Sequence, residues 1–221
     1  GTAVALFVGA GLVLVAQLTS PLWVVSHSSK TSNESFRSPS MWIALLAIGV
    51  AAAWTLWHAQ TGSHGLAFDG AIVIDRFTIF FAVLFTSVAA AVAIVAREWT
   101  ATLDEEHAAD FYALLLVSTG AMVLLAQAND LISIFIALET TSIAQFTMAG
   151  IGRDARSSEA GLKYLLTGAI AAAVLLYGFV FLFGVAGTTS LEGIAEVVQS
   201  GDEDLKLALL LGFVFIVAGL G

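Results

Sequence analysis

Cysteine is absent from this sequence of 221 residues, and charged residues are scarce. The absence of cysteine excludes disulfide bonds and thiolate metal sites. Only 11% of the residues are charged, whereas a soluble domain carries about a quarter, so polar surface is too scarce for a water-soluble globule. The net charge of −9 argues against nucleic acid as a partner, because a phosphate backbone demands a basic face. Lipid is therefore the expected solvent.

Long apolar runs take the place of polar surface. A bilayer core about 30 Å thick needs roughly 20 apolar residues in a helix. That length predicts six complete spans and a truncated seventh, at about 2–25, 41–59, 72–96, 109–127, 129–150, 160–186 and 205–221. The runs are continuous rather than alternating, which excludes a closed barrel. Because small residues run through every span, we expect an all-α, polytopic transmembrane bundle with closely packed helices.

Both ends of the sequence suggest a piece of a longer protein. Gly1 lies at the edge of the first span, and the seventh span is still apolar at Gly221. No removable signal peptide is evident, since the first apolar run is long enough to span and lacks a basic region before it.

The basic residues of the loops predict the orientation of the chain. Loops after the first, third and fifth spans hold all five of them, and the loops after the second, fourth and sixth hold none; the five are Lys30, Arg37, Arg97, Arg153 and Arg156. Cytoplasmic loops carry the excess of Lys and Arg. This pattern predicts a multi-pass protein of the cell inner (plasma) membrane with its N-terminus outside.

Two loops have a character of their own. Residues 26–40 are rich in serine and lack apolar periodicity, which predicts a cytoplasmic linker. Residues 190–204 carry apolar side chains at helical spacing, which predicts a short amphipathic surface helix.

Glu139 is the most informative residue, because it lies in the middle of an apolar span. A charge at the bilayer centre costs roughly 2.5–3.5 kcal/mol on insertion scales, and intramembrane carboxylates mark proton and ion paths. The cost falls if the carboxylate is protonated, faces a wet cavity or pairs with a cation. Ser142 lies three residues on, on the same helix face. The alternative is a neutral glutamic acid that only packs against a neighbouring helix.

Lys163 lies just inside the sixth span and is the second candidate. Glu159 precedes it by four residues, a favourable spacing for an ion pair within one helix. The loop between the fifth and sixth spans is short, so the two spans should be antiparallel neighbours. Glu139 and Lys163 can then share one polar seam at different depths. The alternative is a lysine that extends to the membrane surface.

The other polar residues carry weaker signals. Asn129 or Asp130 can cap the fifth span. Asp69, Asp75 and Arg76 suit either an interfacial anchor or a contact with a partner subunit. His58 and His64 lack the spacing of a metal pair, and His107 lies in a polar loop, so we expect no metal site and no cofactor in this chain.

Three stretches of the sequence resemble the antiporter-like subunit N of respiratory complex I, the NADH–quinone oxidoreductase. They are residues 75–85, 109–146 and 156–191, and the resemblance covers about residues 70–190. The family pattern has an acidic-capped turn, a Leu-Glu pair in the fifth span and Glu-Ala-x-x-Lys-Tyr at the start of the sixth. Here these are Asn129-Asp130, Leu138-Glu139 and the segment from Glu159 to Tyr164.

The resemblance implies the N-terminal half of a proton-translocating membrane-arm subunit. Such subunits have fourteen helices with two inverted repeats. Glu139 would be the glutamate of the proton channel and Lys163 a buried lysine on its path. NADH, flavin, iron–sulfur clusters and quinone would be bound in other subunits, and the partners would be other membrane-arm subunits. The family's key lysine follows a Gly-Leu-Gly in the seventh span, and the next channel lysine lies in helix 8. This sequence stops at Gly219-Leu220-Gly221, so it would not hold a complete channel.

Three other interpretations remain open at the level of sequence. A multisubunit sodium/proton antiporter shares the same helices and the same glutamate. A structural scaffold would tolerate neutral substitutions of Glu139 and Lys163. A free-standing secondary transporter would need a pair of broken helices in matching halves.

Overall fold

The computed structural model describes residues 2–4, 9, 39–61, 65–152, 154–200 and 203–220. Most of the expected first span and of the serine-rich loop 26–40 therefore lies outside the described residues, as do His64 and Arg153.

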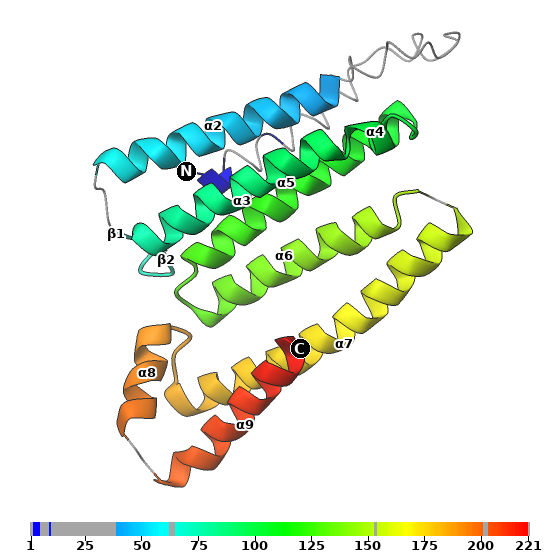
Figure 1. Cartoon of the computed structure of the whole chain (residues 1–221). Helices are drawn as coiled ribbons and strands as arrows, with labels where there is room; N and C mark the ends of the chain where they lie inside the picture. Colours follow the sequence, from blue (N-terminus) through cyan, green and yellow to red (C-terminus); the bar gives the residue numbers. More distant parts are fainter. Residues whose placement is uncertain are drawn as a thin grey trace, which may run out of the picture.

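Helices make up nearly all of the described structure (Figure 1). They are α2 (Pro39–Thr61), α3 (Arg76–Val95), α4 (Arg97–Thr100), α5 (Glu105–Gln127), α6 (Leu131–Ala149), α7 (Ala155–Ala186), α8 (Leu191–Ser200) and α9 (Glu203–Leu220). Five of them contain a segment long and apolar enough to cross a membrane: Ser40–Gln60, Arg76–Val95, Glu106–Gln127, Leu131–Ala149 and Ala155–Ala186. The apolar part of α9, Leu205–Leu220, is shorter.

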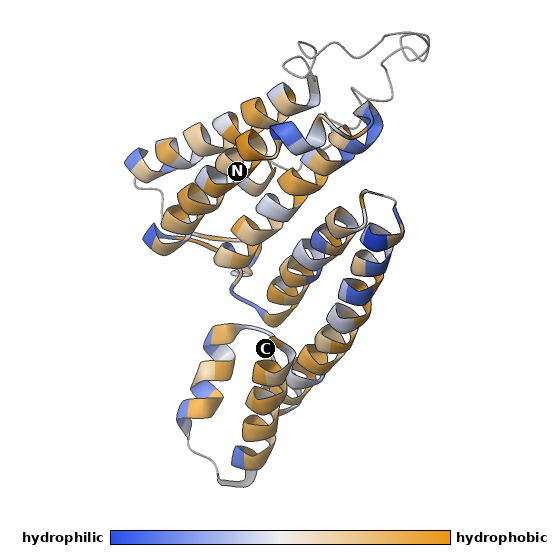
Figure 2. Ribbon diagram, turned by 45° about the vertical axis from the view of Figure 1, so that its right-hand side comes forward, coloured by the Kyte–Doolittle hydropathy of each residue, from blue (hydrophilic) through white to orange (hydrophobic). Residues whose placement is uncertain are grey.

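The helices stack in sequence order across the molecule. In Figure 1, α2, α3 and α5 form one side, α6 lies in the middle, and α7 packs with α9 on the other side. Figure 2 shows apolar residues along the long helices and polar ones mainly near their ends. This distribution is typical of helices that cross a bilayer.

A short β-hairpin corrects the expectation of a purely helical chain. Strands β1 (Gly65–Ala67) and β2 (Ile72–Ile74) pair antiparallel. The third span was expected to begin at residue 72, but its helix begins at Arg76 because Asp75 caps it. The Asp75 carboxylate accepts from the Thr78 amide at 2.8 Å, and the Thr78 hydroxyl accepts from the Asp75 amide at 2.9 Å. This reciprocal pair satisfies amides that the helix start leaves open.

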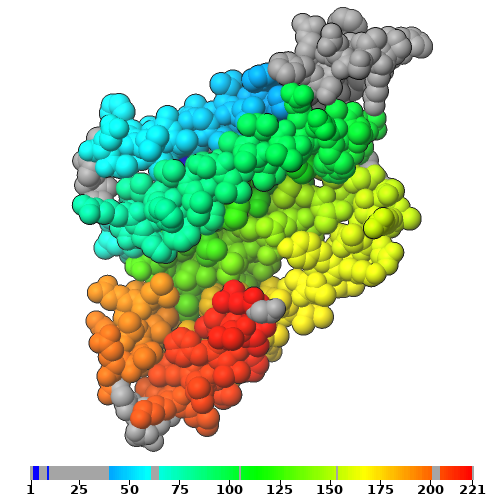
Figure 3. All heavy atoms as spheres, in the orientation of Figure 1, coloured from blue at the N-terminus to red at the C-terminus, as the bar shows by residue number. Residues whose placement is uncertain are grey.

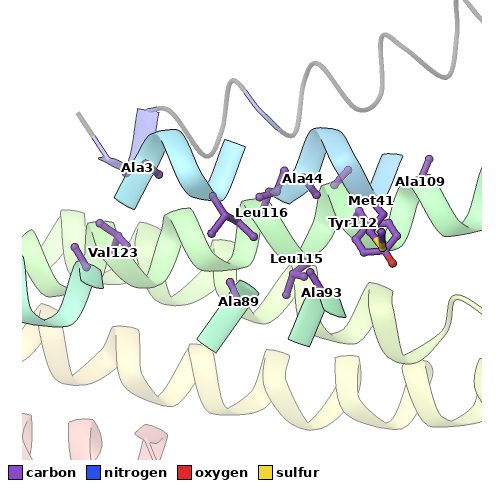
Figure 4. Packing of buried hydrophobic residues seen from close by; sticks show 14 residues of the cluster. Ala3, Met41, Ala44, Ala89, Ala93, Ala109, Tyr112, Leu115, Leu116 and Val123 are labelled. Carbon is purple, nitrogen blue, oxygen red and sulfur yellow. The ribbon is translucent and has the colours of Figure 1, made fainter. Parts of the chain in front are cut away.

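Small residues form much of the core between α2, α3 and α5. Figure 4 shows side chains of the three helices gathered there, among them Ala44, Ala89, Ala93, Leu116 and Tyr112. A second cluster joins α6, α7, α8 and α9 through Leu131, Leu175, Phe179, Leu182, Ile194 and Leu209. Figure 3 shows α8 and α9 side by side on this part of the molecule.

Three loops meet at one end of the bundle, and we call this contact the three-loop junction. It comprises residues 70–71 of the hairpin, 129–130 before α6, and 189–190 before α8 together with Leu191, the first residue of α8. The Asn129 side chain donates to the Gly70 carbonyl at 3.0 Å, and its backbone amide donates to the Ala71 carbonyl at 2.8 Å. The Asn129 carbonyl accepts from the Leu191 amide at 3.1 Å. One residue thus fixes the start of α6 against two other loops.

Candidate functional site

Helix α6 places Glu139 near the middle of a membrane-length helix. The helix begins at Leu131 because Asp130 caps it: one carboxylate oxygen accepts from the amides of Ile132 and Ser133 at 2.8 and 2.9 Å. The other oxygen accepts from the Ser133 hydroxyl at 2.6 Å. Of the two residues that the sequence offered as the cap, Asp130 therefore caps the helix, and Asn129 makes the hydrogen bonds of the three-loop junction.

The Glu139 side chain is half-buried and has no polar partner in the described part of the chain. The neighbouring hydroxyls do not serve it, since Thr140 donates to the Ile136 carbonyl and Thr141 to the Ala137 carbonyl. Ser142 differs from both threonines. Its hydroxyl makes no hydrogen bond among the described residues, and it lies on the face of Glu139.

Toward the C-terminal end of α6, that face is turned toward α7. Residues 139, 142, 146 and 150 recur at helical spacing and share one side of the helix. At its far end, this side contacts α7 closely: a Cβ on Gly161 would lie 3.1 Å from the Cα of Gly150. Phe146 packs its ring against Tyr164, with ring centres 5.6 Å apart. Ser142 lies on this side of α6, whereas Glu139 lies at its edge, one turn from the exposed side chains of Ile136 and Ile143 on the same helix.

Lys163 lies near the start of α7, on the turn that carries Tyr164. Its ammonium pairs with the Glu159 carboxylate, as the spacing of the two residues predicted, and both side chains are largely exposed in this chain. Since Gly161 lies opposite Gly150, Glu139 and Lys163 are separated by about 13 Å along the helix axes. The structure makes α6 and α7 neighbours but does not bring these two side chains into contact.

One polar contact between α6 and α7 lies between the two candidates. The Tyr164 hydroxyl donates to the Gln145 side-chain oxygen at 2.7 Å. The sequence gives no sign that Tyr164 and Gln145 pair, because a helix pattern alone does not fix how two helices are rotated against each other.

Helix α9 brings the end of the chain to the level of Glu139. A Cβ on Gly219 would lie 2.8 Å from the Ala171 carbonyl oxygen and 2.6 Å from the Leu175 amide. Counting along the antiparallel pair from Gly161 and Gly150 places Ala171 at about the height of Glu139. Helix α7 therefore contacts both α6 and α9 near the level of the carboxylate.

The other polar residues singled out in the sequence lie in helix caps, turns and helix ends. Asp75 is a helix cap, and Asp69 lies in the hairpin turn with a positive φ of 53°. His58 is half-buried, and its Nδ1 lies 3.3 Å from the Trp54 carbonyl oxygen. His107 was expected in a loop, but it lies in the first turn of α5, where its Nε2 is buried and has no hydrogen-bond partner among the described residues. Within the described residues, no group of three or more His, Cys, Asp or Glu side chains is placed to hold a metal ion.

Comparison with known proteins agrees with this arrangement. Residues 128–221 match the family described as NADH:quinone oxidoreductase/Mrp antiporter, TM. The chain is 36% identical over 195 residues to NADH-quinone oxidoreductase subunit N of Jannaschia sp. (strain CCS1), an alignment that covers 86% of this chain and 38% of that protein. It is 38% identical over 193 residues to subunit N of Paramagnetospirillum magneticum, with coverage of 85% and 38%.

Two solved structures have a similar fold. A chain of respiratory complex I from Thermus thermophilus, determined with bound aureothin, superposes with a TM-score of 0.71 and 26% identity; the match covers 100% of this chain and 43% of that one. A chain of an archaeal membrane-bound sulfane sulfur reductase gives 0.76 and 18% identity, covering 99% and 43%, and shows the fold alone. The chain thus spans well under half the length of these relatives. It belongs to the family of antiporter-like membrane subunits of NADH–quinone oxidoreductase, among the relatives of subunit N.

Proposed function

We propose that this chain is part of a proton-translocating membrane-arm subunit of an NADH–quinone oxidoreductase, in which Glu139 and Lys163 couple quinone reduction to proton pumping. The observation that carries the proposal is the Glu139 carboxylate, which lies mid-helix and half-buried with no partner among the described residues. Placing such a carboxylate in a bilayer costs free energy unless it binds a proton or pairs with a cation. The relatives named as subunit N support this assignment.

The mechanism is a relay of charge. Quinone reduction elsewhere in the complex perturbs a row of buried charges. A cation that approaches or leaves Glu139 changes the proton affinity of the carboxylate. Glu139 then takes a proton from one side of the membrane and releases it toward the other as the populations of two states shift. This chain supplies the proton-binding groups.

The whole protein would have the fourteen-helix fold with two inverted repeats, in the cell inner (plasma) membrane with its N-terminus outside. Its partners would be other membrane-arm subunits and the lipid bilayer. NADH, flavin, iron–sulfur clusters and quinone would be bound in other subunits of the complex.

The test is Glu139→Gln in the full-length protein within its assembled complex. The amide keeps the shape of the side chain and cannot bind a proton at neutral pH, so we expect fewer protons pumped per NADH oxidised. Proton uptake by membrane vesicles and NADH–quinone activity are measured together. Glu196→Gln on the exposed surface of α8 is the matched control and should pump normally. An assembled Glu139→Gln complex with unchanged pumping would contradict the proposal.

A second candidate is a subunit of a multisubunit sodium/proton antiporter, which the description of the matched family also names. Purification of the native full-length protein separates the two. Iron–sulfur and flavin subunits with NADH–quinone activity in the eluate support the oxidoreductase. Recovery of antiporter-type membrane subunits alone, with sodium-dependent proton movement, supports the antiporter.

A further inference from the structure

The contact between Tyr164 and Gln145 joins the two helices that carry the candidate proton-binding groups. The Tyr164 hydroxyl donates to the Gln145 side-chain oxygen at 2.7 Å. Its ring also packs edge-on against Phe146, at an interplanar angle of 80°. The close approach of Gly161 to Gly150 brings the two backbones together one turn away. The hydrogen bond is therefore flanked by packing contacts, while the Tyr164 side chain is 43% exposed in this chain.

Lys163 needs such a link to influence Glu139. Its ammonium pairs with Glu159, which lies one turn closer to the start of α7 and so farther from Glu139. About 13 Å of helix separates the levels of the two candidates, which is too far for a direct hydrogen bond. An influence of Lys163 on Glu139 through hydrogen bonds requires polar groups in between.

Helix α6 supplies those groups at regular spacing. Glu139, Ser142 and Gln145 follow one another at intervals of three residues, so each is a neighbour of the next in a row that winds around the helix surface. The Ser142 hydroxyl is not engaged by any described residue, unlike the hydroxyls of Thr140 and Thr141. Because Gln145 accepts from Tyr164 with its oxygen, its NH₂ group stays able to donate toward this row.

We infer that Tyr164 and Gln145 are positioning residues whose hydrogen bond connects the turn bearing Lys163 to the row that ends at Glu139. The inference rests on the proposed function. The tyrosine hydroxyl sits beside Lys163 in the chain, and the glutamine amide continues to Ser142. Loss of the bond leaves both helices packed through Phe146 and the glycines but interrupts the polar connection.

Two variants in the full-length protein test this within the assembled complex. Tyr164→Phe keeps the ring on Phe146 and removes the hydroxyl, and Gln145→Met keeps the length of the side chain and removes the amide. Each should slow proton translocation by roughly two- to tenfold, the range expected for the loss of one hydrogen bond. The double variant should be no slower than either single one, since both remove the same bond.

The pH profile of translocation separates positioning from a general structural defect. It should shift in Tyr164→Phe and Gln145→Met, because the surroundings of Lys163, Glu159 and Glu139 change, whereas poor assembly only lowers the amount of complex. Tyr177→Phe is the matched control, since Tyr177 lies in α7 with an exposed side chain, and it should change neither rate nor profile.

Glu139→Gln is measured alongside to keep the two proposals apart. Slower translocation in Glu139→Gln with an unchanged rate and profile in an assembled Tyr164→Phe or Gln145→Met complex overturns the inference and leaves the proposed function standing. Unchanged translocation in Glu139→Gln overturns both.

Discussion

The backbone of Gly178 in α7 runs against that of Gly212 in α9, so closely that a Cβ on Gly178 would lie 2.7 Å from the Gly212 carbonyl oxygen. A methyl group there also meets Ile216 at 2.7 Å. Since the two nearest obstacles include backbone, the contact leaves no room for a side chain. The packing of α9 on α7 therefore depends on glycine at this position.

Gly178→Ala should destabilise the protein by about 1–3 kcal/mol, the usual cost of overpacking. The measurement is the thermal unfolding midpoint of the purified membrane protein in mild detergent. Gly184→Ala is the control within the same helix, because a Cβ there meets nothing within 4 Å. Equal midpoints for the two variants would show that α9 does not pack on α7 in this way.

Asn129→Ala should weaken the three-loop junction. The Gly70 carbonyl would lose its side-chain donor, at a cost of about 0.5–1.5 kcal/mol. Limited proteolysis of the hairpin should become faster together with a lower unfolding midpoint. Gln199→Ala removes an exposed amide from α8 and should leave both unchanged. A hairpin as resistant in Asn129→Ala as in the unaltered protein would count against the junction.

Tyr112→Phe tests a buried polar contact in the core. Tyr112 is fully buried, and its hydroxyl lies 3.1 Å from that of Thr100. We expect a loss of about 0.5–1.5 kcal/mol in the free energy of unfolding, because one hydrogen bond disappears without a gain in packing. Tyr177→Phe, at an exposed ring of α7, should cost nothing measurable by the same unfolding assay. A Tyr112→Phe protein as stable as this control would refute the contact.

The cap of α7 predicts a dependence of stability on pH. Hydrogen bonds from the Ser157 side chain and amide lower the pKa of Asp154 below its ordinary value of 3.8. Because the folded-state pKa is the lower one, the stabilisation by Asp154 is complete above the ordinary value and is lost as the pH falls through the folded value. The difference in unfolding midpoint between the unaltered protein and Asp154→Ala should therefore shrink in acid.

Midpoints measured from neutral pH down into the acid range check this expectation. Glu196→Gln, which removes an exposed carboxylate outside the membrane helices, serves as the control with no such trend. A constant difference between the unaltered protein and Asp154→Ala at all pH values would show that the charge of Asp154 does not support the cap.

Composition and helix length predict much of this fold. Apolar runs of membrane length give the long helices, and an acidic residue before a run marks where α6 begins. Apolarity and helix length do not predict the β-hairpin. Ile72, Val73 and Ile74 are as apolar as the helix that follows them, and what makes them a strand is pairing with residues 65–67 and contact with the loop before α6.

Some features of the candidate site could likewise be predicted from the sequence, and others could not. Helical spacing alone predicts that Ser142 shares a face with Glu139 and that Lys163 pairs with Glu159, and the structure contains that ion pair. The lack of a polar partner for the Glu139 carboxylate among the described residues, and the bond between Tyr164 and Gln145, depend on how α6 and α7 are rotated and how deep each lies. Those quantities are set by contacts such as Gly161 with Gly150, which join distant parts of the sequence.

The three-loop junction also makes Asn129 the natural pivot for any tilt of α6. One end of the helix is fastened to two other loops, whereas the other end leads into the turn before α7. A tilt of about 5° about Asn129 displaces Glu139 by about 1 Å and the end of α6 by more than 2 Å, given the rise of 1.5 Å per residue. Any such tilt would therefore move Gln145, with its hydrogen bond to Tyr164, farther than Glu139, and it would have to displace the close contact of Gly150 with Gly161.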